Sequence, residues 1–218
     1  MKTRLTILLL TLALVGCGGG SPSTTHGDIG KGWTAYFSKG DGESENVLQL
    51  TQIPNVPRPI QTPGGCFFSF PHGGGHANYI TRRVQGGAHG SMQLQFKIEG
   101  KATFKALDGG QPATLHPYFE EGLTLNNWWA KNSGVVLNDA INKGVLTITV
   151  SFAPSEWSNV IGQPADYDAS TLADFNKALS DMGHAGITIG GWSQWGHGAK
   201  NADDSGKVTF TIIGLTFL

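Results

Sequence analysis

Hydrophobic and polar residues alternate with a period of two in several stretches of the chain. SMQLQFKI, residues 91–98, places its apolar side chains on one face, and VLTITVSF, residues 145–152, repeats the pattern. Because successive side chains of a strand point to opposite faces, both stretches are predicted to be half-buried strands. The C-terminal KVTFTIIGLTFL predicts a long core strand with a bend or bulge at Gly214. Shorter strands are expected over 33–37, 47–50, 67–70, 78–82, 102–107, 113–119 and 187–190.

One segment, DASTLADFNKALSDMG at 168–183, departs from this alternation. Its apolar residues recur at helical spacing, at Leu172, Phe175, Leu179 and Met182. Asp168 or Ser170 can cap the first turn, and Gly183 can end the helix in the left-handed conformation. We therefore expect one short amphipathic helix over about 170–182, beside about nine or ten antiparallel strands. The predicted fold class is all-β, an antiparallel jelly-roll β-sandwich with this helix packed on or beside it.

Composition agrees with a turn-rich β protein and narrows the choice of partners. The chain has 32 glycines in 218 residues, and charged residues make up only 14%. Both values favour a secreted β protein over a helical bundle. The formal net charge is -1 and lysine and arginine form no cluster. Nucleic acid is therefore not an expected partner.

The first 16 residues carry two early positive charges and then an apolar run that is too short to span a bilayer. This is typical of a secretory signal peptide. The run ends in LVGC, which resembles the lipobox of bacterial lipoproteins and implies that Cys17 is diacylated and becomes the first residue. An ordinary signal peptide that ends in cysteine is the alternative. Gly18 in place of aspartate is similar to lipoproteins sent to the outer membrane, so we expect a lipid-anchored protein of the bacterial envelope.

The rest of the chain is expected to form a lipidated tether, residues 17–31, and one β-sandwich domain, residues 32–218. GGGSPSTTHGDIG is rich in glycine and serine, as flexible tethers are. No linker divides the remainder, which has the length of one domain. With Cys17 bound to lipid, Cys66 has no partner cysteine, so we expect no disulfide within the chain.

The C-terminal two thirds of the chain resemble a known class of β-sandwich. NNWWAK at 126–131, EWSNVIG at 156–162, GITIGG at 186–191 and GHG at 196–198 occur in this order. This order is similar to carbohydrate-binding-module-like, galactose-binding-like sandwiches, and more closely to bacterial and phage-borne proteins of this architecture without an established activity. The resemblance implies the fold, and no binding residue is carried over from it.

Motifs for catalysis are weak in this sequence. HGGG, residues 72–75, occurs in the oxyanion loops of esterases, but no G-x-S-x-G nucleophile motif accompanies it. A glycine-rich hairpin loop is therefore the better interpretation. Glu120 and Glu121 are neighbours, so on a strand they would point to opposite faces and could not form a catalytic pair. Glu156, beside Trp157, is the one acidic residue in an aromatic setting, and a loop or capping role is expected for it. We predict that the protein is not an enzyme.

No cofactor is expected, and the metal candidates are few. His72 and His76 are separated by three glycines, which do not favour the helical spacing that would bring two imidazoles together. Asp41, Glu43 and Glu45 alternate in DGESEN and could hold a structural calcium ion. A solvated acidic turn is the alternative for that loop.

Tryptophans give the strongest signal for binding. Trp128 and Trp129 are adjacent, so in an extended segment one should point into the core and the other outward. Trp192 and Trp195 lie in GGWSQWGHG, where His197 could add a polar contact to a ligand site. An exposed indole can stack on the apolar face of a sugar ring. Packing in the core or over its rim is the alternative for each tryptophan.

Three functions remain open at this point. The first is a carbohydrate-binding lipoprotein of the envelope without catalytic activity. The second is a structural lipoprotein that binds another envelope protein. The third is an envelope glycan hydrolase, which requires two carboxylates or a metal-bound histidine cluster in one cleft.

Overall fold

The computed structural model describes the backbone of residues 33–38, 47–49, 60–62, 65–69, 76–84, 87, 90–106, 112–122, 127–191, 198–203 and 208–218. The predicted signal peptide, Cys17 and the tether lie outside these residues. The segment with Asp41, Glu43 and Glu45 and the HGGG motif also lie outside them.

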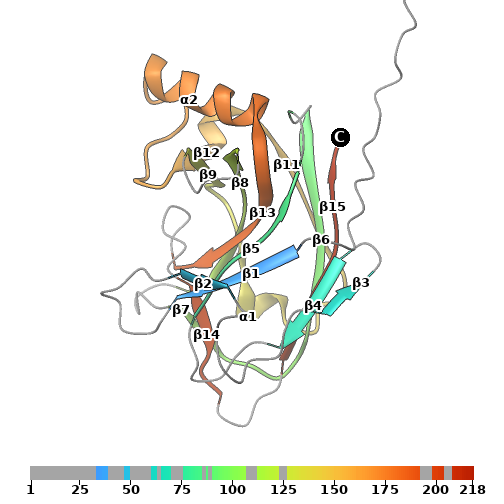
Figure 1. The fold of residues 1–218 in the computed structure, drawn as a ribbon. Coiled ribbons are helices and arrows are strands. Elements are labelled where there is room, and N and C mark those ends of the chain that lie inside the picture. The colour runs from blue at the N-terminus through green and yellow to red at the C-terminus, as the bar shows by residue number, and fades with distance from the viewer. Residues whose placement is uncertain are drawn as a thin grey trace, which may run out of the picture.

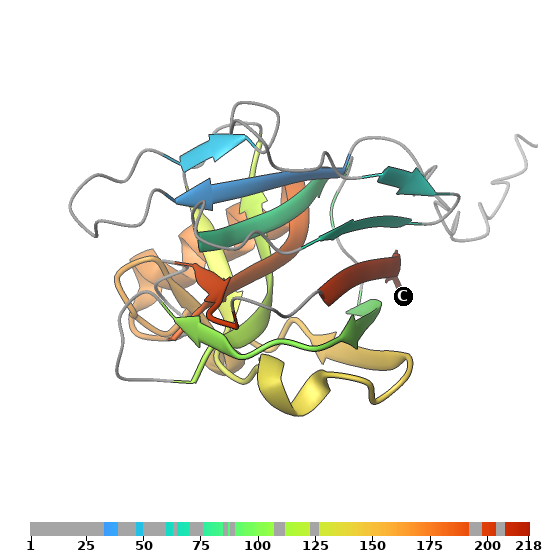
Figure 2. The same cartoon turned by 90° about the horizontal axis from the view of Figure 1, so that it is seen from below.

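Two antiparallel sheets pack face to face, which confirms the predicted all-β sandwich (Figure 1). The larger sheet has ten strands, and its main path is β12 (Trp157–Asn159), β9 (Trp128–Lys131), β8 (Thr114–Glu121), β13 (Met182–Gly190), β5 (His76–Arg83), β1 (Trp33–Ser38) and β2 (Val47–Gln49). Off this path, β10 (Val135–Val136) pairs with β8, and β14 (Ala199–Asn201) pairs with β5 and with β7 (Phe104–Ala106). The smaller sheet has the order β11 (Leu146–Ser151), β6 (Ser91–Gly100), β15 (Val208–Phe217), β4 (Gly65–Ser69) and β3 (Ile60–Thr62). Each sheet is built from several separate parts of the chain, in runs of one to four consecutive strands, so the chain crosses repeatedly between the layers (Figure 2).

The alternation in β6 and β15 builds the centre of the core, as the sequence predicts. All four apolar side chains of β6 from Met92 to Ile98 are fully buried. Phe96 stacks on Phe210 of β15, with ring centroids 5.6 Å apart. The expected irregularity is also present, because the pairing of β15 with β6 shifts between Ile212 and Gly214. This shift keeps Leu215 in the core at 1% exposure.

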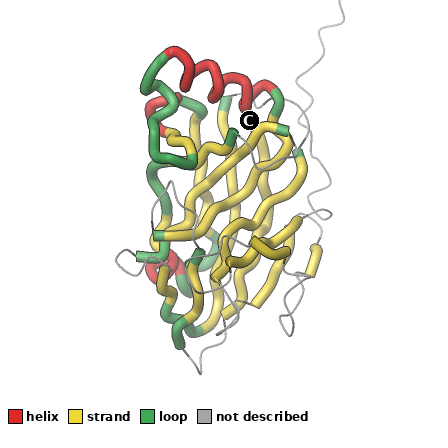
Figure 3. The backbone as a smooth tube through the Cα atoms, turned by 60° about the vertical axis from the view of Figure 1, so that its left-hand side comes forward, coloured by secondary structure: helices red, strands yellow, loops and turns green. Residues whose placement is uncertain are grey.

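Helix α2 (Ala169–Ser180) lies across one end of the sandwich, and the short helix α1 (Leu137–Ala140) lies toward the other (Figure 3). Asp168 caps α2, since its Oδ1 accepts a hydrogen bond of 2.7 Å from the backbone N–H of Thr171. Phe175 is fully buried and packs against the rings of Phe119 and Trp129, with centroids 5.6 and 5.2 Å apart. The helix thereby closes the open end of the core.

The prediction that Gly183 ends this helix is wrong. The helix ends at Ser180, and Met182 and Gly183 already belong to β13. A glycine is needed at position 183 because a Cβ there would overlap the backbone of Gly122. The sequence pattern also does not predict α1, the 3-10 turn η2 (Pro154–Glu156) or the strands β3, β9, β10, β12 and β14.

Candidate functional site

The larger sheet has a second covered face, on the side away from the smaller sheet. In β8, Leu115 and Phe119 point into the core between the sheets. The side chains of His116, Tyr118 and Glu120 therefore point to the opposite side, which we call the outer face. A solvent-facing side of an antiparallel sheet normally carries exposed polar residues. Here, in contrast, these three residues are 4%, 0% and 1% exposed.

Strand pairing arranges the outer face in rows. In the strand order β9, β8, β13 and β5, the first row contains Trp128, Glu120, His184 and Arg83. The second row contains Ala130, Tyr118, Gly186 and Thr81. The third row contains His116, Thr188 and Tyr79, from β8, β13 and β5. The first row is mainly charged and titratable, and the second contains two of the smallest side chains. Among the described residues of this face, Arg83 of β5 is exposed and Tyr79 of β5 is half-buried.

Glu120 and His184 are in close contact in the first row. Nδ1 of His184 lies 2.7 Å from Oε1 of Glu120. The side chain of Glu120 is 1% exposed and that of His184 is 17% exposed. Burial raises the pKa of Glu120, and His184 offsets part of that rise. A carboxylate is therefore held in a site where its charge is poorly solvated.

Three aromatic rings cover the middle of the outer face. The ring centroid of Tyr79 lies 5.4 Å from that of Tyr118 and 6.2 Å from that of Trp128. Strands β5 and β9 are three strand positions apart, roughly 14 Å, so the side chains of Tyr79 and Trp128 lean toward each other. Ala130 and Gly186 leave room for them, and Gly186 is also required because a Cβ there would overlap the carbonyl oxygen of Ile80.

Several buried polar atoms on this face have unused hydrogen-bonding capacity. Within the described part of the chain, neither Oε2 of Glu120 nor Nε1 of Trp128 has a hydrogen-bond partner, and the same holds for Oγ1 of Thr188. Buried polar groups in native proteins are nearly always paired. Thr81, on the same face, shows the ordinary case, because its hydroxyl donates to the carbonyl oxygen of Ala185 at 3.2 Å. The unpaired atoms therefore mark this face as a candidate ligand site.

His116 has a different role in the third row. Its Nδ1 lies 2.9 Å from the carbonyl oxygen of Lys131. Burial lowers the pKa of His116. This histidine is therefore a neutral donor that ties β8 to the end of β9.

The expectation that Trp128 or Trp129 points into solvent is wrong. Trp128 is 5% exposed and Trp129 is 1% exposed. The two rings do point to opposite faces, but both faces of the sheet are covered at β9. Trp129 lies in the core against Phe175, where its indole N–H donates to Oδ1 of Asn127 at 2.9 Å. Trp128 belongs to the ring cluster of the outer face.

The other predicted ligand residues, Trp192, Trp195 and His197, lie outside the described residues. The ends of their segment are defined, since the backbone N–H of Gly198 donates to the carbonyl oxygen of Ile189 at 2.9 Å. This bond places Gly198, the first described residue after the segment, beside the end of β13. Their part in binding stays a prediction.

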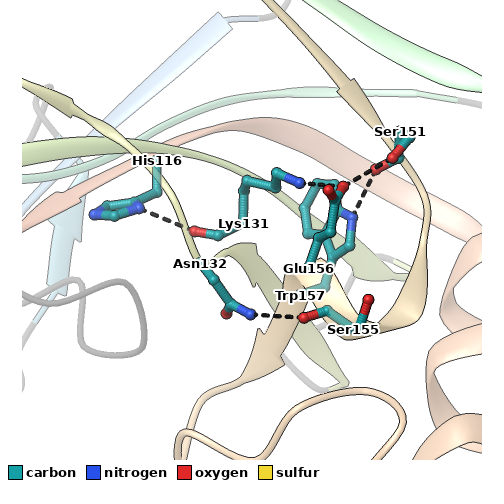
Figure 4. A network of polar contacts seen from close by, with 7 residues as sticks. All are labelled: His116, Lys131, Asn132, Ser151, Ser155, Glu156 and Trp157. Atoms are coloured by element: carbon teal, nitrogen blue, oxygen red, sulfur yellow. Dashed lines mark hydrogen bonds and ion pairs between the residues drawn. The ribbon is translucent and has the colours of Figure 1, made fainter.

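Glu156 has a structural role, as the sequence analysis expects. Its carboxylate binds the ammonium group of Lys131 and accepts a hydrogen bond of 2.8 Å from the hydroxyl of Ser151 (Figure 4). The indole N–H of Trp157 donates to the carbonyl oxygen of Ser151 at 2.9 Å. Lys131 is the main cause of the lowered pKa of Glu156, and Ser151 adds to it. This network joins β9 and η2 to β11.

Glu120 and Glu121 point to opposite faces, as the alternation predicts. Glu121 binds the ammonium group of Lys177 at 2.6 Å and accepts a hydrogen bond of 2.8 Å from the side-chain amide of Asn127. These two contacts occupy its carboxylate and join α2 to the end of β8. It cannot act together with Glu120.

The described residues contain neither a metal-binding cluster nor a membrane-spanning helix. No three of their histidine, cysteine, aspartate and glutamate side chains lie close enough to hold a metal ion. None of their helices has both the length and the apolar character needed to cross a membrane. Comparison with known proteins finds no matching family model and no similar curated protein.

Sequence reasoning missed the pairing of Glu120 with His184 and the roles of Tyr79, Tyr118 and Thr188. A signal was present in TLHPYFEE at 114–121, where histidine, tyrosine and glutamate alternate with leucine, proline and phenylalanine. That pattern indicates a strand whose second face carries titratable residues. It does not indicate that this second face is buried.

Proposed function

We propose that this protein is a lipid-anchored envelope protein that binds carbohydrate on the outer face of its larger sheet, without catalysis. The observation that carries the proposal is a set of buried polar atoms around three aromatic rings, on Glu120, Trp128 and Thr188, that have no hydrogen-bond partner within the described part of the chain. A buried polar group without a partner costs about 1–3 kcal/mol. A ligand that meets these groups recovers this free energy on binding.

Sugars suit such a face for two reasons. Each hydroxyl group both donates and accepts a hydrogen bond, so it fits acceptors such as a carboxylate and donors such as an indole N–H. The faces of sugar rings are apolar and pack on aromatic rings, as in ligand sites that combine apolar walls with a few placed polar groups. We expect the ligand to approach from the side of β5, where Arg83 is exposed and Tyr79 is half-buried. Trp192, Trp195 and His197 would extend this site at the end of β13.

The other two functions have less support. Hydrolysis by a carboxylate pair requires a second carboxylate opposite Glu120, and Glu121 is committed to Lys177 on the other side of the sheet. A structural protein that binds another envelope protein is the alternative. The aliphatic side chains of Val160 and Ile161, 50% and 62% exposed, would suit such a partner.

Affinity electrophoresis of the full chain tests the proposal. The gels contain galactan, xylan, mannan or β-glucan, and a pull-down with purified peptidoglycan runs beside them. We expect retardation by at least one of these glycans, and weaker retardation of the double variant Trp192→Ala with Trp195→Ala at an unchanged melting temperature. If no glycan retains the folded protein while crosslinking in cells recovers a single envelope protein, the structural function is correct instead.

A further inference from the structure

We propose that Glu120 and Trp128 together hold one hydroxyl group of the ligand, and that this pair makes the site select neutral sugars. This inference rests on the proposed function. Glu120 and Trp128 are directly opposite each other on β8 and β9. Side chains at such positions have Cβ atoms about 4.5–5.5 Å apart, so their ends can reach the same ligand atom.

The two side chains need complementary partners. An ionised carboxylate only accepts hydrogen bonds, and an indole N–H only donates one. Oε1 of Glu120 is in contact with His184, so Oε2 is the oxygen left for a ligand. Nε1 of Trp128 also lacks a partner among the described residues. A group that bridges them must therefore donate to one and accept from the other.

Among the common substituents of sugars, only a hydroxyl group satisfies both side chains through a single atom, because the acetamido group donates from its nitrogen and accepts at its separate carbonyl oxygen. A hydroxyl group donates to Oε2 and accepts from Nε1. The carboxylate of a uronic acid accepts from Nε1 but brings a second negative charge next to Glu120, which is costly in a buried site. The ammonium group of an unacetylated amino sugar donates to Oε2 but leaves the indole N–H unpaired. The pair therefore selects a neutral hydroxyl at this position.

The chain offers matched controls for both residues. Glu120→Gln keeps the shape of the side chain and removes its charge, and Glu121→Gln makes the same change one residue away on the other face. Trp128→Phe removes the unpaired N–H and keeps an aromatic ring. Trp129→Phe removes an N–H that is bonded to Asn127 in the core.

The experiment uses the neutral polysaccharide that retains the wild-type full chain best, with polygalacturonate and chitosan as charged probes. We expect Glu120→Gln and Trp128→Phe each to weaken retention about tenfold, the loss expected for one charge-assisted or buried hydrogen bond. Glu121→Gln and Trp129→Phe should bind as the wild type does, even where Trp129→Phe lowers the melting temperature. Neither charged polysaccharide should retain the wild type.

Three results would overturn the inference while leaving sugar binding in place. These are equal retention of all four folded variants, preferential retention by polygalacturonate or chitosan, and a liganded structure in which only a water molecule lies between Glu120 and Trp128. Failure of every glycan to retain the wild type would overturn the proposed function itself. Glu120→Gln and Trp128→Phe are both conservative changes. If one of these variants does not fold, the other still tests the inference.

Discussion

Replacing Thr188 by valine should stabilise the unliganded protein and weaken its binding of sugar. Thr188 is 1% exposed, and within the described residues its hydroxyl has no hydrogen-bond partner. Valine has almost the same shape and no polar atom. The substitution therefore removes the cost of burying an unpaired hydroxyl, about 1–3 kcal/mol. In a domain of this size 1 kcal/mol shifts the melting temperature by about 2–4 °C.

Thr81→Val is the matched control. Thr81 lies on the same face at 2% exposure, but its hydroxyl donates to the carbonyl oxygen of Ala185. Loss of that hydrogen bond should cost about 0.5–1.5 kcal/mol. Both changes replace threonine by valine inside a strand, so their effects on strand propensity cancel in the comparison.

Thermal unfolding followed by circular dichroism measures both variants. We expect the melting temperature to rise for Thr188→Val and to fall for Thr81→Val, with sugar retention reduced more strongly for Thr188→Val. If both variants lose the same stability, the hydroxyl of Thr188 is already paired in solution. The unpaired polar atoms of the outer face would then not be reserved for a ligand.

Three further predictions concern packing, charge and the lipid anchor. Phe175→Ala should lower the free energy of unfolding by about 3–5 kcal/mol, because it leaves a cavity under α2. Chemical denaturation measures this free energy. Asn176 is exposed, so Asn176→Ala is the control and should change it little. Because burial raises the pKa of Glu120 above its ordinary 4.5, the folded state binds a proton more tightly than the unfolded state, and stability should fall as the pH rises from about 4.5 through the raised value. In Glu120→Gln, the melting temperature should no longer fall over this pH range. A variant with the same pH profile as the wild type would contradict the assignment of this fall to Glu120. Cys17→Ser should abolish incorporation of labelled palmitate in a bacterial host, and persistent labelling would show that lipid is attached elsewhere.

The parts of the fold that sequence could predict are those with long periodic patterns. The ten residues of β6 and of β15 give clear periods, and their core sides are placed correctly. In α2, Phe175 is buried as predicted, but Thr171 and Ala178 are the other buried residues, and the predicted Leu172 and Leu179 are only half-buried. Strands β9 and β12, of four and three residues, are too short to show a period. Gly183 illustrates a different limit, because the reason for a glycine there is the approach of Gly122 from a distant part of the sequence.

The candidate site could be predicted only in part. Sequence reasoning gave tryptophan the main role, and Trp128 does belong to the outer face. It could not show that β8, β9, β13 and β5 lie side by side, and this order is what brings Glu120 next to His184 and Tyr79 next to Trp128. Nor could it show burial on both sides of the larger sheet.

The most direct test is to map changes in amide chemical shifts of the labelled protein during a titration. The titrant is a set of short oligosaccharides of the neutral polysaccharide that retains the protein best. We expect the largest changes on the outer face of the larger sheet, at Tyr79, Tyr118, Glu120, Trp128 and His184. Changes confined instead to the polar face of the smaller sheet, where Gln93 and Gln95 bond to Thr149 and Thr147, would contradict the assignment of the binding face.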